Sequence, residues 1–144
     1  MAETVKQTTK QRPGTMRLID AMKYRLPLAG VVSILHRISG AIMFVLLPFI
    51  IWMFDTSVTS EISYDTFTSA FVAGIGFLPA WFVKLTVLAL IWAFLHHFVS
   101  GIRHLWMDMT HSVTKELGRM SAVSTLLSSL GLTTVLGAKL FGLY

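Results

Sequence analysis

Three long segments that are both predominantly apolar and free of charged residues determine what this sequence can fold into. They occupy residues 38–54, 85–102 and 121–138. An α-helix needs roughly 17 to 25 apolar residues to cross the hydrocarbon core of a bilayer, and each segment meets that length. We therefore predict an all-α membrane protein with three transmembrane helices. The predicted spans are residues 31–54, 81–106 and 121–143.

The composition and the distribution of charge agree with this class. Hydrophobic residues make up 54% of the chain and charged residues 13%, and the mean hydropathy is +0.69. The net charge of +5 comes from basic residues beside the apolar segments, rather than from the aromatic-interleaved patches that bind phosphates. We therefore exclude a nucleic-acid partner. The absence of cysteine excludes disulfides, covalently attached haem and any iron–sulfur cluster held by this chain.

The chain divides into a tail, residues 1–29, and a membrane domain, residues 30–144. Apolar residues recur at helical spacing over residues 16–26, which predicts an interfacial helix; an irregular segment packed on a partner is the alternative. Lys and Arg are most frequent before the first uncharged segment, so the N-terminus should face the cytoplasm, or the matrix in a mitochondrion. The loop before the second span is expected to contain a short helix that starts at Ser60 and Glu61.

Two histidines, His96 and His97, lie inside the second uncharged segment, where an ionisable residue is costly unless it has a function. On a helix, His97, Gly101, His104 and Asp108 share one stripe, with His97 about 10 Å deeper than His104. His97 could ligate a haem iron, with Gly101 leaving room for the ring and the propionates facing the charged end. The alternative is a histidine that only packs between helices. His96 points about 100° away and is expected to pack, although it remains the alternative ligand.

The first span offers a matching edge near the same membrane face. Ser33, Arg37 and Gly40 follow one another at intervals of four and three residues, with His36 beside them. Arg37 could pair with a haem propionate or with a quinone carbonyl, and Ser33 could donate a hydrogen bond to the same quinone oxygen. Alternatively, His36 and Arg37 only anchor the helix to lipid headgroups. Arg103 is expected only to cap the helix and to follow the preference for basic residues at the cytoplasmic ends of spans, so it is left out of the site.

Two motifs carry a resemblance to a known family. Residues 33–40, S-I-L-H-R-I-S-G, resemble the motif S-I-x-H-R-x-S/T-G of the succinate dehydrogenase cytochrome b family, the haem-binding membrane anchors of complex II. Residues 97–108 resemble that family's second motif, H-x-x-x-G-x-R-H-x-x-x-D, and follow in the same order. The tail departs from the usual R-P-x-S-P-H-L opening, since residues 12–16 read R-P-G-T-M.

The resemblance assigns roles to individual residues. It implies that His97 is the axial ligand of haem b and that Ser33 and Arg37 line a ubiquinone pocket. It places His36 near the haem propionates, together with Arg37. His104 and Asp108 match motif positions in the haem and quinone vicinity.

The resulting hypothesis is a haem b-binding membrane anchor of succinate:ubiquinone oxidoreductase in a bacterial inner membrane, or alternatively a mitochondrial one. Succinate oxidation belongs to flavoprotein and iron–sulfur partners, which pass electrons to quinone. No other histidine is expected at the depth of His97 on a different helix, so a second membrane subunit should supply the other haem ligand. That subunit should pack on the first span and on a small-residue stripe of the third, formed by Ser121, Ser124, Ser128 and Gly131.

Two alternatives remain for the function. One is a fumarate reductase-type anchor that uses menaquinone. The other is a three-helix transport or accessory subunit without haem, in which the intramembrane histidines relay protons.

Overall fold

The structure, a computed structural model, describes residues 26–111 and 114–144. These residues are helical, apart from turns and one isolated bridge between Ile75 and Leu78. The predicted interfacial helix falls almost entirely outside the described residues. The helices are α2 (Leu28–Val45), α3 (Leu47–Val58), α4 (Glu61–Ser69), α5 (Ala80–Thr110) and α6 (Lys115–Leu140).

Three of these helices are long and apolar enough to cross a membrane, namely α2, α5 and α6. The predicted fold class, an all-α protein with three candidate transmembrane helices, is therefore confirmed. Only 11–22% of the residues in their most apolar windows are buried. Most of the helix surface is thus left for lipid or for other subunits. The side of the membrane that the N-terminus faces stays a prediction.

The first span, predicted as one segment, is divided into two helices. α2 ends at Val45 and α3 begins at Leu47, with Pro48 in the first turn of α3. Proline has no N–H to donate to the carbonyl four residues before it, and its ring collides with that carbonyl, so a helix bends or breaks there. Pro48 is the sequence feature that could have predicted this break.

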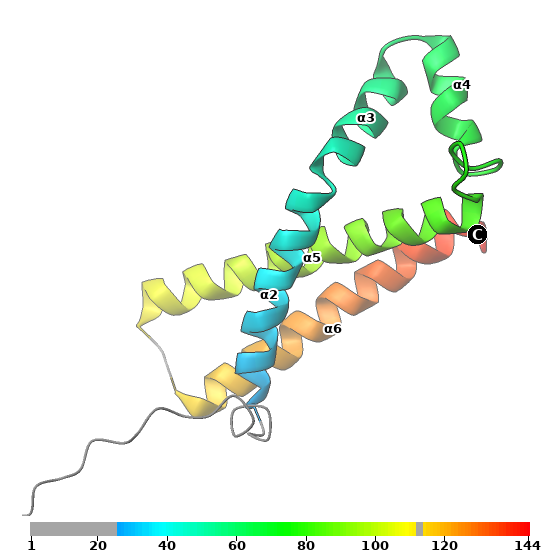
Figure 1. The fold of residues 1–144 in the computed structure, drawn as a ribbon. Helices are drawn as coiled ribbons and strands as arrows, with labels where there is room; N and C mark the ends of the chain where they lie inside the picture. The colour runs from blue at the N-terminus through cyan, green and yellow to red at the C-terminus, as the bar shows by residue number, and fades with distance from the viewer. Residues whose placement is uncertain (1–25, 112–113) are drawn as a thin grey trace, which may run out of the picture.

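The connection from α3 to α5 contains the short helix that the sequence predicted. Ser60 caps α4: its Oγ accepts the Ser63 N–H at 3.1 Å, and Ser63 Oγ accepts the Ser60 N–H at 2.9 Å. This reciprocal pair satisfies two donors that the first turn of a helix otherwise leaves free. α4 leads back to the start of α5 (Figure 1).

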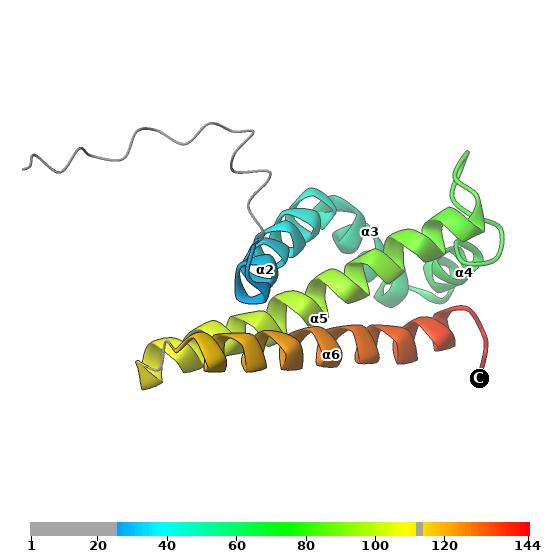
Figure 2. The same cartoon turned by 90° about the horizontal axis from the view of Figure 1, so that it is seen from below.

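The spans are arranged as a pair of helices crossed by a third. α5 and α6 run antiparallel and side by side, and α2 crosses them (Figures 1 and 2). Within the described residues, α3 makes no close backbone approach to α5 or α6. The first span therefore touches the other two through α2 and diverges from α5 through α3.

Small and polar residues, rather than large apolar ones, fill the interfaces between the helices. The fully buried side chains include Ser39 of α2, Ala93 and Ser100 of α5, and Ala122 and Ser129 of α6. Large apolar side chains mostly face outward. This inversion is expected in lipid, where helices associate through close packing and hydrogen bonds, and small residues let their backbones approach.

Among the described residues, only part of the predicted small-residue stripe of α6 packs against another helix. Ser124, Ser128 and Gly131 are exposed, whereas Ser121 is half-buried and accepts a hydrogen bond from Arg103 of α5. The exposed part is available to another helix.

Arg103 joins α5 to α6 instead of only capping a helix. Its side chain is 8% exposed, its Nε donates to Ser121 Oγ at 2.9 Å, and its Nη2 donates to the Gly118 carbonyl at 3.4 Å. Hydrogen bonds from a charged donor are stronger than neutral ones. Arg103 therefore fixes the end of α5 that carries the predicted site.

We expect Arg103 and Ser121 to be energetically coupled. In a double-mutant cycle of Arg103→Ala and Ser121→Ala, the coupling should be about 0.5–2 kcal/mol, the range of interhelical hydrogen bonds in membranes. The measurement is the free energy of unfolding of the purified protein in detergent. Arg119→Ala, at an exposed position of α6, is the control. Additive effects of the two substitutions would show that the bond contributes no stability.

Candidate functional site

Three histidine rings from two helices meet near one end of the bundle. His36 of α2 stacks on His97 of α5, with ring centroids 4.0 Å apart and an interplanar angle of 18°. The His104 ring also contacts His36, with its centroid 5.2 Å away and its plane tilted by 55°. The structure thus brings together three of the six residues predicted for the site. We call this group the histidine cluster.

Two glycines give these rings space between the helices. A Cβ atom at Gly40 would lie 3.0 Å from His97 Cε1 and 3.3 Å from His97 Nδ1, which is closer than nearly all real contacts. A Cβ atom at Gly101 would lie 3.8 Å from His36 Nε2, an ordinary contact. Gly40 is therefore required for the close crossing of α2 and α5. The space beside Gly101 faces His36.

The His97 ring is oriented by the backbone of α2. Its Nδ1 lies 3.0 Å from the His36 carbonyl oxygen and 3.3 Å from Ser39 Oγ, which itself donates to the same carbonyl at 2.8 Å. A carbonyl oxygen only accepts hydrogen bonds, so Nδ1 carries the proton in this arrangement. Nε2 then holds the lone pair, and this is the form in which a neutral imidazole binds a metal.

His36 lies beside His97 on a different helix, where the sequence led us to expect no histidine. That expectation was wrong, because the register between α2 and α5 brings the two residues to one level. Two axial ligands of one iron point their nitrogens at each other from opposite sides, whereas these two rings are stacked face to face. His36 is therefore not placed as the second ligand of an iron bound to His97.

The other predicted residues lie outside the histidine cluster. Arg37 and Asp108 are exposed, and Ser33 is half-buried. In α2 the fully buried positions are Val32 and Ser39, so Arg37 lies on the side that the described part of the chain does not cover. The predicted quinone-binding edge is open to whatever surrounds α2.

His96 packs against α6, as its position on the helix predicted. It is fully buried, its Nδ1 lies 3.2 Å from Ser129 Oγ, and its ring stacks on Trp92 at 5.5 Å. Its Nε2 and the Ser100 Oγ have no hydrogen-bond partner among the described residues. His96, Ser100 and Arg103 together form the polar face of α5 toward α6. This face was not predicted from the sequence, although steps of three and four residues from His96 reveal it.

Comparisons with known proteins place these features in a family. The model of the succinate dehydrogenase/fumarate reductase transmembrane subunit family matches residues 8–136. A succinate dehydrogenase cytochrome b556 subunit of Coxiella burnetii is 30% identical over 77% of this chain and 84% of its own length. The corresponding subunits of Paracoccus denitrificans and Rickettsia felis are 28% and 24% identical. They align with 78% and 94% of this chain, and with 81% and 98% of their own lengths.

We expect Gly40→Ala to destabilise the protein by about 1–3 kcal/mol, the usual cost of overpacking a tight contact. The added methyl group must displace the His97 ring or separate α2 from α5. Gly30→Ala in the same helix is the matched control, because its Cβ would meet only ordinary contacts at 3.7 Å. Thermal unfolding of both purified variants provides the measurement. Equal stability of the two would mean that the crossing tolerates a side chain.

Proposed function

The chain belongs to the succinate dehydrogenase/fumarate reductase transmembrane subunit family, and we propose that it is the haem b-binding membrane anchor of a succinate:ubiquinone oxidoreductase. The proposal rests chiefly on His97, whose Nδ1 faces the His36 carbonyl so that Nε2 is left to bind iron. The named relatives are all cytochrome b556 subunits of succinate dehydrogenase, which supports haem b and favours succinate oxidation over fumarate reduction. The family match argues against the transport alternative.

The residues of the histidine cluster fit a haem held from one side. Haem b supplies a centre that accepts and releases one electron. His97 is the proposed axial ligand, and its bond to the His36 carbonyl fixes the ring and makes Nε2 more basic. His36 and Arg37 are proposed to meet the propionates with cationic or donor groups, and His104 to complete the same end of the site. Asp108 is proposed to lie in the same vicinity.

A second membrane subunit is the proposed source of the other axial ligand. His36 is stacked on His97 rather than opposed to it. His96 is directed to Ser129 on the other side of α5. The same subunit is proposed to cover the exposed edge of α2 and the exposed stripe of α6, so that the anchor is an obligate heteromer.

Ser33 and Arg37 are proposed to bind the quinone. They lie one helical turn apart on α2, and Arg37 is exposed. The guanidinium of Arg37 remains charged and donates to a quinone carbonyl, and its attraction grows as negative charge develops on that oxygen. Ser33 donates a neutral hydrogen bond to the same oxygen. Two electrons from partner clusters and two protons from the nearby aqueous face convert the quinone to quinol.

The remaining assignments follow from this role. Because the chain has no cysteine, the iron–sulfur clusters belong to a peripheral partner, and succinate oxidation belongs to a flavoprotein. The relatives are bacterial, which supports a bacterial inner membrane. Residues 1–29 are proposed as a tail on the cytoplasmic side, and residues 30–144 as the anchor domain.

We expect His97→Ala to abolish the b-type absorption bands of the purified complex. The substitution removes the ligand, whereas His96→Ala, at the adjacent residue, removes only the packing against α6. Reduced-minus-oxidised visible spectra of both complexes, normalised to the amount of inserted protein, give the haem content. Unchanged haem in His97→Ala would overturn the ligand assignment.

Arg37→Ala should lower the quinone reductase activity about tenfold or more, because a hydrogen bond from a charged donor is lost. Arg37→Lys should recover part of this loss, since it keeps the charge but not the planar fork. Succinate oxidation with an artificial dye acceptor, measured on the same complex, should be unaffected. A parallel fall of both activities would indicate an assembly defect rather than a quinone site.

A further inference from the structure

Ser39 of α2 is fully buried where α2 crosses α5, and its hydroxyl belongs to a close group of three polar atoms. Its Oγ donates to the His36 carbonyl oxygen at 2.8 Å and lies 3.3 Å from His97 Nδ1. His97 Nδ1 donates to the same carbonyl oxygen at 3.0 Å. The hydroxyl and the imidazole therefore share one acceptor, and we call these three atoms the shared-carbonyl group.

A serine inside a helix often donates to the carbonyl three or four residues earlier, and that bond alone implies no function. Ser57 and Ser69 make such bonds at exposed positions of α3 and α4. Ser39 differs from them in two respects. Its acceptor also binds a side chain from another helix, and its own full burial excludes solvent as an alternative partner. A change at the Ser39 hydroxyl therefore changes the hydrogen bond of His97.

The distances within the shared-carbonyl group show in which direction Ser39 acts. A carbonyl oxygen has two lone pairs, and a donor on one of them leaves less electron density for a second donor. The Ser39 hydroxyl could also accept from His97 Nδ1–H, but 3.3 Å lies beyond the usual range for such a bond. Its donation at 2.8 Å has the ordinary length. Competition for the carbonyl therefore prevails, and Ser39 weakens the bond made by His97.

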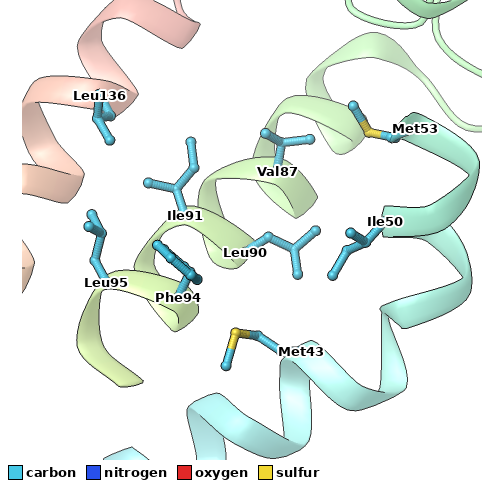
Figure 3. Close-up of a pocket in the computed structure, with 9 residues that line it drawn as sticks. All are labelled: Met43, Ile50, Met53, Val87, Leu90, Ile91, Phe94, Leu95 and Leu136. Carbon is cyan, nitrogen blue, oxygen red and sulfur yellow. The ribbon is translucent and has the colours of Figure 1, made fainter. Parts of the chain in front are cut away.

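No other polar group is placed to replace the Ser39 hydroxyl in the described part of the chain. There, His97 Nδ1 has two hydrogen-bond partners, the carbonyl and the hydroxyl, and the His36 ring meets the His97 ring face to face. One turn beyond Ser39 along α2, Met43 begins an apolar groove whose nine lining residues are all aliphatic, aromatic or methionine (Figure 3). Removing the hydroxyl therefore frees the carbonyl for His97 without supplying another donor.

We propose that Ser39 sets how strongly His97 donates electron density to the iron of haem b, and so raises the reduction potential of that haem. The inference rests on the proposed function, in which His97 is the axial ligand. A strong acceptor on Nδ1–H makes Nε2 a more basic ligand, and a more basic ligand favours the more highly charged, oxidised iron. By sharing the carbonyl, Ser39 moderates this effect. Ser39 is thus a positioning residue that acts on the iron only through His97.

The test is a redox titration of the haem in the intact purified complex, followed by its visible spectrum. Ser39→Ala frees the carbonyl for His97 and should lower the ratio of reduced to oxidised haem at a fixed potential. The expected change is about threefold or more, which is about 28 mV in midpoint potential at roughly 59 mV per tenfold for one electron. Ser39→Thr keeps the hydroxyl and should stay closer to the wild-type potential than Ser39→Ala.

Ser129→Ala is the matched control, because this serine of α6 makes corresponding contacts to the neighbouring histidine. Ser129 is also fully buried, its Oγ donates to the Leu126 carbonyl at 3.3 Å, and the same atom lies 3.2 Å from His96 Nδ1. His96 faces α6 and is not the proposed ligand. The control should therefore leave the haem potential equal to that of the wild type.

An unchanged potential in Ser39→Ala with a normal haem content would overturn the inference. So would a raised potential, which would mean that the hydroxyl mainly accepts from His97, and so would an equal shift in Ser129→Ala, which would mean a general loosening of the helices. If Ser39→Ala binds no haem, Ser39→Cys carries the test, because its thiol is a weak donor and should also lower the potential. A wild-type complex without b-type bands would instead refute the proposed function.

Discussion

The contact between Gly40 of α2 and His97 of α5 determines the arrangement of the first two spans. Because Gly40 has no side chain, the backbone of α2 comes close enough for the His36 carbonyl to accept a hydrogen bond from His97 Nδ1–H. On one side of this contact the rings of His36, His97 and His104 gather. On the other side the helices diverge around an apolar groove. The close contact that Gly40 permits therefore lies between the polar histidine cluster and the apolar groove.

The lipid environment explains why polar residues hold the helices together. Lipid tails solvate apolar side chains as well as another helix does, so large apolar residues gain little by turning inward. Accordingly, α5 meets α6 through His96 and Ser129, and through Arg103 and Ser121. These bonds orient α5 so that His96 faces α6 while His97 faces α2. The two neighbouring histidines thus have different environments because each faces a different helix.

Features that depend on one helix could be predicted from the sequence, and features that depend on two could not. The length of the uncharged segments predicted the three spans, and helical periodicity separated His96 from His97. The insertion of the His36 ring against His97 depends on the register between α2 and α5, which no spacing within either helix encodes. The role predicted for Arg103 was incomplete for the same reason, because its partners lie on α6. The break at Pro48, in contrast, is a local feature that the sequence contains, although the first span was predicted as one unbroken segment.

The distribution of the site residues indicates why this chain is proposed to act only within a complex. His97 is fixed by α2, yet Arg37 and Asp108 are exposed rather than buried among the three spans. On α6, Ser121 is engaged by Arg103 while Ser124 and Ser128 remain exposed. Exposed small residues on a membrane helix leave a surface on which another helix can pack closely. The exposed stripe of α6 therefore favours a neighbouring membrane helix, in agreement with the proposal that a second membrane subunit supplies the other ligand of the haem.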